Sequence, residues 1–433
     1  MSTLDDIVTV QITLESPTVS ALGFGTPMIV AHAPFSGVHT YDSGTALADM
    51  VSDGFATSSR AYKLASALLS ADIKVVQLKV GSRPSAAWQQ VTHVTPSPVA
   101  NTTVYSLNVN GTAVSFTSDG TATLAEICTG LQTAISAVTG VTATTDSLKV
   151  VVTTTATNAV VKVNAPSNVK IEDKTADAGI VADLTALAAL DDDFYGFVID
   201  SPSELEMIAA AGWAETQVKI FAAHLSGSRP GDASDTTDNA SAMHTTAYKN
   251  TFAIYHSDQT QCPDAAWLGV MMPKDPSFGG SWIFKSLGGV TGEKLSGSFI
   301  TGLRSKRVNT YENKGGTYVT LGAYMFGPRF IDQTTLVHEL TARIQERGWL
   351  ALQNDLPYSD ASGDALVGEV LSELQIRVTR GSLLANPAPV CTHPLVSSIS
   401  SVDKAARHFP DINFSAHTSG GVHSVTITGK LIV

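Results

Sequence analysis

Both ends of this chain carry the pattern of a β-strand with one buried face, and this pattern constrains the fold more than any other feature. Near the start, apolar residues occupy every second position: Val8, Val10, Ile12 and Leu14. Near the end, a second alternating run places four apolar residues on one face: Val425, Ile427, Leu431 and Val433. A period of two predicts a half-buried strand. No turn follows the second run to bring back a partner, so we expect both ends to pair with neighbouring copies.

The bulk composition predicts a soluble protein of several domains. With 433 residues, of which 43% are apolar, the chain is long enough for two to four domains with separate cores. No unbroken apolar stretch is long enough to span a bilayer, so no membrane insertion is expected. The start shows no basic region followed by an apolar core, as a secretory signal would. We therefore expect a protein that is made and used in the cytoplasm.

Charge is low and its sign is acidic. Charged residues make up 15% of the chain, against roughly 25% in a typical soluble domain. Contacts between identical copies would then require less charge to be desolvated. The net charge of −12 argues against direct nucleic-acid binding. The densest basic stretch, Arg304, Lys306 and Arg307, is short, and we expect it to make structural contacts with acidic surfaces.

The cysteines predict neither a metal site nor a disulfide framework. Cys128, Cys262 and Cys391 lie far apart, and their number is odd. We expect reduced, mostly buried thiols.

Alternating strand and helix signals predict an α/β core that is interrupted by a second module. A buried strand at 27–31, a helix at 58–70 and a strand at 73–80 open the core, which resumes with strands near 193–200, 218–222 and 252–255. We assign residues 26–90 with 181–325 to this interrupted core domain.

The segment 91–180 is rich in threonine and predicts a self-contained β/α peripheral module. Asn110-Gly111 is a favoured two-residue hairpin turn. A helix follows, with Thr123 as its expected N-cap.

Residues 326–420 predict a C-terminal α/β domain between the core and the last strand. Its first helix is expected to be capped by Asp332 and to bury Val337, Leu340 and Ile344 on one face. A second helix is expected at 365–374, the stretch 386–394 is expected to be a linker, and a final pair of strands closes the chain. With an N-terminal arm at 1–25 and a C-terminal strand arm at 421–433, the fold class is α/β and α+β, multi-domain, with an inserted β-rich module and extended arms.

Catalytic and cofactor motifs are incomplete. His338-Glu339 lacks the second histidine that a zinc site needs, because position 342 is Ala342, so we expect a helix surface. The run 23–27 has a proline where a dinucleotide-binding helix would begin. Asp191, Asp192 and Asp193 are expected to form a solvated turn rather than a cation site.

Catalysis by a serine triad is not excluded by sequence, but no Gly-x-Ser-x-Gly elbow carries a nucleophile. His417 and His423 are expected to be exposed. We assign no catalytic, cofactor-binding or metal residues, and we expect that the chain is not an enzyme and needs no cofactor.

Three segments in the second half resemble a known family. They are Phe330-Ile331-Asp332 followed by 342–347, the run 354–360, and Gly269-Val270-Met271-Met272 with the later Trp282 and 285–290. These segments and the order of parts resemble contractile bacteriophage (myovirus-type) tail sheath proteins. The resemblance covers most of the chain outside about 90–180.

The resemblance implies a structural subunit that polymerises around a tail tube by strand exchange between neighbouring copies. Contraction would then drive the tube through the host envelope without nucleotide. The implied partners are other copies of the chain, the tail tube protein, and the baseplate and tail terminator proteins. The implied location is the virion tail, assembled in the host cytoplasm. Arg343 and Arg347 are candidate tube-facing contacts, with a salt bridge on the helix surface as the favoured alternative.

Two other function classes stay open at this stage. The threonine-rich module suggests a surface decoration or host-binding β protein of a virion. An α/β enzyme would require a pocket with convergent titratable groups. Among sheath-like assemblies, the sequence does not separate a phage tail from a bacteriocin or a secretion machine.

Overall fold

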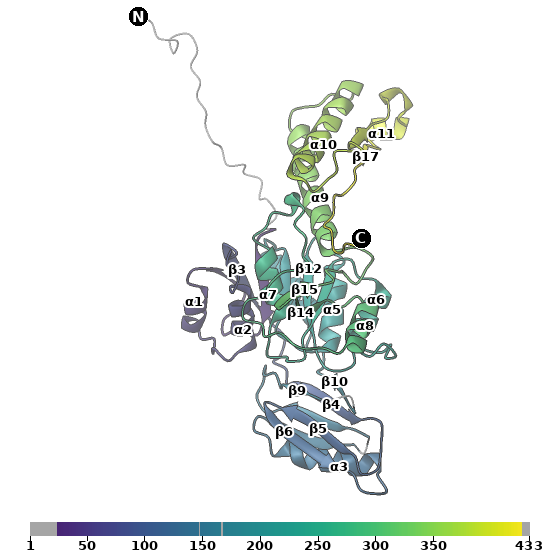
Figure 1. Cartoon of the computed structure of the whole chain (residues 1–433). Coiled ribbons are helices and arrows are strands. Elements are labelled where there is room, and N and C mark those ends of the chain that lie inside the picture. The colour runs from purple at the N-terminus through teal and green to yellow at the C-terminus, as the bar shows by residue number, and fades with distance from the viewer. Residues whose placement is uncertain (1–23, 147, 166–167, 427–433) are drawn as a thin grey trace, which may run out of the picture.

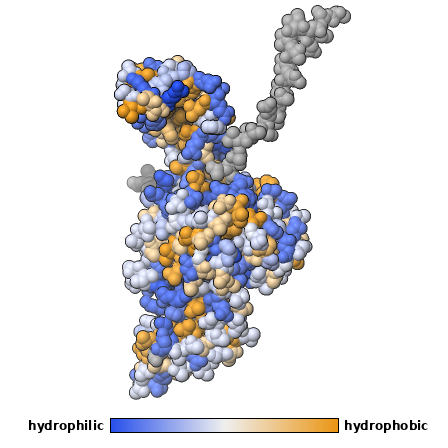
Figure 2. Space-filling view, turned by 180° about the vertical axis from the view of Figure 1, so that it is seen from behind, coloured by the Kyte–Doolittle hydropathy of each residue, from blue (hydrophilic) through white to orange (hydrophobic). Residues whose placement is uncertain are grey.

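A computed structural model describes residues 24–146, 148–165 and 168–426, arranged as three parts in a row (Figure 1). A central sheet covered by helices lies between a β-rich module at one end and a long helical hairpin at the other. Seen from behind, the hairpin joins the central part through a narrow neck (Figure 2). In the described part of the chain, no helix is both long and apolar enough to cross a membrane.

The central sheet has six strands in the order β13-β12-β11-β1-β3-β2. Five are parallel: β1 (Pro27–Ala31), β3 (Gln77–Ser82), β11 (Gly196–Ile199), β12 (Ile220–Leu225) and β13 (Thr251–Tyr255). The edge strand β2 (Val38–Asp42) runs antiparallel to β3. Because β1 lies between β3 and β11, the chain winds outward from β1 in both directions.

Helices cover both faces of this sheet. One core layer forms under α2 (Arg60–Leu68) and α7 (Pro263–Met271), with α1 (Ala46–Ser52) beside them. The other layer packs under four helices: α4 (Ile180–Leu190), α5 (Glu204–Ala214), α6 (Asn239–Thr246) and α8 (Gly297–Ser305). Apolar residues on both faces of each strand fit a parallel sheet that is buried on both sides.

The module between β3 and α4 has a hydrophobic core of its own. One sheet contains β10 (Val169–Asp173), β4 (Val91–Pro96), β8 (Val150–Thr154) and β7 (Val141–Thr145). The other contains β6 (Thr112–Thr117), β5 (Val104–Val109) and β9 (Val163–Asn164), and α3 (Leu124–Ser136) packs against both.

Local signals in this module predicted its structure well. The turn residues Asn110 and Gly111 have φ of 51° and 84°, as a two-residue hairpin requires. The Thr123 side chain accepts a hydrogen bond from the Glu126 N–H, which confirms the expected cap.

The second half of the chain adds a small ribbon and the hairpin. The ribbon pairs β14 (Thr310–Lys314) with β15 (Thr317–Leu321), and the hairpin consists of α9 (Ile331–Leu352) and α10 (Asp360–Arg380). Beside it, β16 (Val390–Thr392) pairs with β17 (Asn413–Ser415), and α11 (Ser401–Ala406) lies between them in sequence. Two 3-10 turns lie at Pro276–Phe278 (η2) and Val396–Ser398 (η3).

Four local predictions were wrong. The stretch 386–394 is not simply a linker, because Val390–Thr392 forms β16. The N-cap of α9 is Phe330 rather than Asp332, and Val337 is 38% exposed because the buried face of the helix carries Leu336 and Leu340. The third predicted strand begins at Gln77, not at Ile73, which lies 69% exposed in the turn after α2.

Most of the predicted terminal strands lie outside the described residues, namely Val8, Val10, Ile12, Leu14, Ile427, Leu431 and Val433. Val425 is described, is 76% exposed and belongs to no strand of the single chain. The three cysteines are free and buried, as expected.

The packing of α7 on α2 depends on Gly269. A Cβ at this position would lie far inside van der Waals contact with the backbone carbonyl of Leu68. Gly269→Ala should therefore lower the free energy of unfolding by about 1–3 kcal/mol, because a backbone atom must shift. Urea unfolding followed by tryptophan fluorescence measures the loss, since Trp267 and Trp282 lie in this core.

Gly368→Ala in α10 is the matched control, because a Cβ there meets nothing within 4 Å. Alanine favours a helix by up to about 1 kcal/mol over glycine. Equal effects of the two substitutions would show that the close approach at Gly269 is unimportant.

Candidate functional site

Buried charged side chains occupy the position where a sheet of this topology usually binds a ligand. In doubly wound sheets, ligands bind beyond the carboxyl ends of the strands where the winding direction reverses. Here that point lies beyond β1 and β11, at His32 and Asp200. The side chain of Arg83 is fully buried there. It lies 2.8 Å from Asp183, 2.5 Å from Glu206 and 3.5 Å from Asp200.

The same cluster ties down both chain segments that lead to the module. On the outgoing side, the Ser85 hydroxyl donates to Asp183 at 2.6 Å. On the returning side, the Ala178 N–H donates to Glu206 at 3.1 Å. The Ser203 hydroxyl donates to the carbonyl of Thr175 at 2.7 Å. The reversal point therefore serves as a clamp for the inserted module.

Hydrogen bonds and neighbouring charges favour the ionised forms of Asp200 and Arg83. Burial alone would raise the pKa of Asp200, but the hydrogen bond from His32 and the charge of Arg83 outweigh it and lower the pKa. Burial likewise opposes the charge of Arg83, and its bonds to Glu206 and Asp183 together with nearby Asp200 raise its pKa instead. In this cluster one guanidinium pairs with three carboxylates, and all four side chains are buried.

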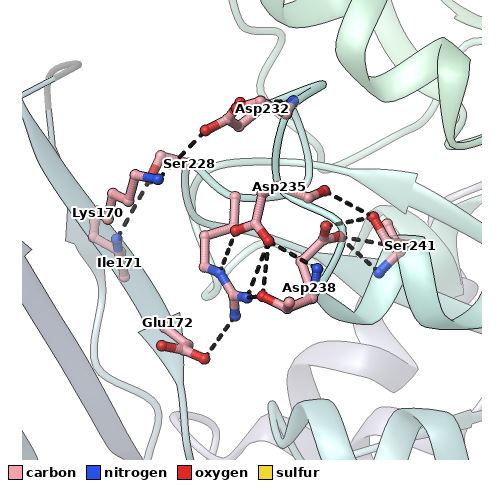
Figure 3. A network of polar contacts seen from close by, with 12 residues as sticks. Lys170, Ile171, Glu172, Ser228, Asp232, Asp235, Asp238 and Ser241 are labelled. Atoms are coloured by element: carbon pink, nitrogen blue, oxygen red, sulfur yellow. Dashed lines mark hydrogen bonds and ion pairs between the residues drawn. The ribbon is translucent and has the colours of Figure 1, made fainter.

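A second polar network joins the module to the loop after β12 (Figure 3). Lys170 and Glu172 on β10 reach across to this loop, where Lys170 lies 3.6 Å from Asp232. Arg229 links Glu172 at 2.8 Å to Asp235 at 2.7 Å. Behind them, buried Asp238 accepts from Ser241 at 2.7 Å and pairs with Lys306 at 2.6 Å.

Two carboxyl groups near this network have raised pKa values. Burial raises the pKa of Asp173 to about 6, although Thr92, Gln90 and Gln259 donate hydrogen bonds to it. Burial also raises the pKa of Glu204 to about 8. Both groups face structural partners, so we interpret them as part of the joint.

At the opposite, amino-terminal edge of the sheet, a few specific contacts hold the hairpin to the core. The Tyr195 hydroxyl and His338 Nδ1 are 3.0 Å apart and hydrogen-bonded. The Thr334 hydroxyl donates to the carbonyl of Lys249 at 3.1 Å. Arg380 donates to Asp275 at 3.1 Å and to Ser277 at 2.6 Å.

The hairpin itself is held largely by ion pairs. Its buried apolar cluster contains Leu336, Leu340, Leu374 and Leu383. Between the helices, Arg377 is 1% exposed and pairs with Glu339 and Glu373. These side chains line a cleft of about 620 Å³. The expectation that Glu339 lies on a helix surface was wrong, because the second helix covers it and leaves it 3% exposed.

The two candidate tube-facing arginines belong to this charged cleft. Arg343 lies 2.8 Å from Glu346 and 3.5 Å from Glu339. Arg347 lies 2.8 Å from Glu373 and 3.2 Å from Glu369. Both thus make the intramolecular salt bridges that the sequence favoured. Their contact with a tube stays a prediction.

The small sheet of β16 and β17 presents unpaired edges. It contains two strands, and no third strand of the described chain pairs with it. Val390 is 54% exposed and Phe414 45% exposed, so part of its apolar surface is also uncovered. Such a sheet is a template for strands from another chain.

Other sequence expectations are resolved by contacts. The basic stretch is structural, because Arg304 pairs with Glu312 at 3.1 Å and Lys306 with Asp238. The carboxylates of the predicted acidic turn pair with Lys79 and Lys219. His423 is only partly exposed, contrary to expectation, because it packs on Phe330 and bonds Ser281. No cluster of three or more metal-ligating side chains occurs in the described ranges.

Comparison with solved structures identifies the fold. The helical sheath of the anti-feeding prophage in its contracted state aligns with a TM-score of 0.54 and 12% identity, covering 98% of this chain and 99% of that chain. A sheath tail protein from Desulfitobacterium hafniense aligns with a TM-score of 0.47 and 9% identity, over 94% and 99% of the two chains. One from Listeria innocua aligns with a TM-score of 0.45 and 10% identity, over 85% and 88%. Family models and curated proteins give no match to the sequence.

The chain therefore has the fold of contractile tail sheath proteins. The expected mixture of α/β and α+β parts in a multi-domain chain is confirmed.

Protonation of His338 should destabilise the fold. Burial and nearby Arg329 lower its pKa from 6.5 to about 4. Below pH 6.5 the unfolded chain binds this proton while the folded chain does not, so stability falls as the pH drops from 6.5 towards 4. At pH 5.5 the loss from this residue should be about 1 kcal/mol. Urea unfolding at pH 7.5 and 5.5 should show a smaller loss in His338→Gln.

Exposed His417→Gln is the control for this measurement and should leave the pH dependence unchanged. An identical pH dependence in His338→Gln and the parent chain would contradict the assignment.

Removing the central arginine of the hairpin should be costly. Arg377→Met leaves Glu339 and Glu373 without their buried partner and should destabilise the hairpin by about 3 kcal/mol. Arg343→Met, at a side chain that is 36% exposed, should cost less than about 1 kcal/mol. Amide exchange in residues 331–380 measures both effects, and equal protection in the two variants would contradict the dependence on Arg377.

Proposed function

We propose that this chain is a structural subunit of a contractile tail sheath, and that its copies join by strand exchange. The observation that carries the proposal is the two-stranded sheet of β16 and β17, whose edges have no partner in the described chain. The alternating ends of the sequence supply strands that fit such edges. The fold shared with a sheath protein in a helical assembly supports the same conclusion.

The positions of the chain ends are suitable for this role. The first described residue, Phe24, packs on Tyr195 at the foot of the hairpin. Near the other end, His423 packs on Phe330 at the start of α9. Phe24 and His423 thus both lie near the base of the hairpin, on the side of the core that carries β16 and β17.

We infer that each arm adds a strand to a neighbour through main-chain hydrogen bonds, with its apolar side chains setting the register. Val8, Val10, Ile12 and Leu14 would face the neighbour at one end, and Val425, Ile427, Leu431 and Val433 at the other. We divide the chain accordingly into arms at 1–25 and 421–433, a core at 26–90 with 181–325, a module at 91–180 and a C-terminal domain at 326–420.

The proposed mesh surrounds a tail tube and contracts to drive the tube through a host envelope. Contraction is a shift between two packings of the same subunits and consumes no nucleotide. Tail tube, baseplate and tail terminator proteins are the proposed partners, and Arg343 and Arg347 the proposed tube contacts. The protein would assemble in the host cytoplasm and reside in the virion tail.

The inserted module supports a second candidate role. It has its own hydrophobic core and lies at the opposite end from the hairpin (Figure 1). A module in this position would face away from the tube, as a surface decoration or host-binding element would.

Removal of residues 423–433 should abolish assembly, because the donor strand is lost while the core stays folded. A sharper variant places aspartate at Val425, Ile427 and Leu431, on the apolar face of the arm. The matched control places aspartate at Ser424, Thr426 and Thr428, on the opposite face. Electron microscopy and sedimentation should show tubes of uniform width for the parent and the control only.

Tubes from the truncated chain, formed as readily as by the full chain, would contradict strand exchange. Loss of tubes in both aspartate variants would show that added charge, rather than the apolar face, is decisive.

A further inference from the structure

Three aromatic rings connect the start of the described chain, the central sheet and the hairpin. The rings of Phe24 and Tyr195 have centroids 4.7 Å apart. The ring of His338 on α9 meets Tyr195 edge-on, with centroids 5.8 Å apart, and bonds its hydroxyl at 3.0 Å. Tyr195 is 2% exposed, so the middle of this row lies inside the protein. One side chain thus contacts both of the parts that extend from the core.

Tyr195 is fixed to the sheet by its backbone. It immediately precedes β11, and its N–H donates to the carbonyl of Thr26 at 3.0 Å. Its own carbonyl accepts from the N–H of Ile220 at 2.9 Å. These two backbone hydrogen bonds hold Tyr195 in a fixed position at the amino-terminal edge of the sheet.

Phe24 lies beside open space. A cleft of about 320 Å³ is lined by Phe24, Gly25, Met272, Glu339 and Arg343. A much smaller cavity, of about 20 Å³, lies between the same ring, Tyr195 and Thr335. The ring of Phe24 therefore contacts Tyr195 on one side and has room to move into the cleft on the other.

The neck between hairpin and core is narrow (Figure 2). Near His338, the other side-chain bonds from α9 and α10 to the core are those of Thr334 to Lys249 and of Arg380 to Asp275 and Ser277. The aromatic row is therefore one of a few side-chain links between α9 and the core.

We propose that Phe24, Tyr195 and His338 form a latch that couples the root of the N-terminal arm to the tilt of the α9–α10 hairpin. The inference rests on the proposed function: tension on an arm held by one neighbour would be transmitted to the hairpin, which carries the open sheet that receives strands from another. A pull on Phe24 towards the open cleft removes its packing from Tyr195 and loosens the support of His338.

The latch is electrically neutral, unlike the rest of the hairpin. Burial raises the pKa of Tyr195 and lowers that of His338 to about 4, so both are uncharged at pH 7. Salt should weaken the partly exposed Arg380–Asp275 pair but leave this contact unchanged. The contribution of the latch can therefore be separated from that of the ion pairs.

The test measures amide exchange of residues 331–344 in the unassembled full-length chain. Tyr195→Phe keeps the ring and removes the hydroxyl, and should accelerate exchange of this segment about threefold to tenfold at low and high salt alike. Tyr255→Phe is the matched control: its buried hydroxyl makes one bond of 2.9 Å to Gly227, far from the hairpin. It should leave exchange in this segment unchanged.

The decisive variant is Phe24→Ala, which alters the root of the arm and not the hairpin. It should also accelerate exchange at 331–344, and its effect should not add to that of His338→Ala, because the two act through the same tyrosine. Unchanged exchange in Phe24→Ala, or full additivity, would overturn the latch.

Different experimental results would refute the latch and the proposed function. Exchange in the unassembled chain depends on no sheath, whereas tube formation depends on the arms. If Tyr195→Phe forms tubes with unchanged exchange at 331–344, the latch is refuted and the sheath role stands. If exchange accelerates as expected but the parent chain forms no tubes, the coupling stands and the sheath role is refuted.

Discussion

The buried guanidinium of Arg83 determines how this molecule is organised. An isolated charge in such a place would be prohibitive, and three carboxylates surround it at 2.5 to 3.5 Å. The carboxylates come from α4, α5 and the end of β11, while Arg83 itself begins the path to the inserted module. One cluster thus joins the sheet, two covering helices and the module, and it occupies the crevice where related topologies bind substrates. Its position explains why side chains of the protein itself occupy the reversal point of this α/β core.

Different kinds of interaction hold the module and the hairpin at the two edges of the sheet. At the carboxyl-terminal edge, the module is joined by the buried ion pairs of Arg83 with three carboxylates and by the network around Arg229. At the amino-terminal edge, the hairpin depends on a neutral aromatic contact, a few polar bonds and internal ion pairs around Arg377. The first joint is suited to rigidity, while the second has a narrow neck and adjacent open space.

Local patterns predicted the elements that depend on local rules. Three of these elements depend on a few neighbouring residues each. An apolar run predicts the strand at 27–31, residues that tolerate positive φ angles predict the Asn110-Gly111 turn, and the Thr123 side chain predicts the start of its helix. The start of the third strand and the cap of α9 were missed, because the surrounding structure decides how far an apolar run stays buried.

The long-range charge clusters were beyond prediction. Arg83 meets partners that lie 100 and 123 residues away in sequence, and a single arginine after a strand gives no sign of them. Arg377 similarly pairs with Glu339 at a separation of 38 residues. In contrast, the alternating apolar residues at the two ends predict strands from each segment alone, without knowledge of a pairing partner. The sheet of β16 and β17 joins segments about 20 residues apart, and no local pattern predicts their pairing.

Because of the clamp around Arg83, the inserted module is a unit that another folded unit could replace. Because the outgoing and returning segments are anchored to α4 and α5 before the module begins, the core does not depend on the module's own hydrophobic cluster for its shape. A different folded unit between the same two anchors would then leave the central sheet and the hairpin in place. The segment between Ser85 and Ala178 can therefore change in size and shape without altering the contacts at its two ends.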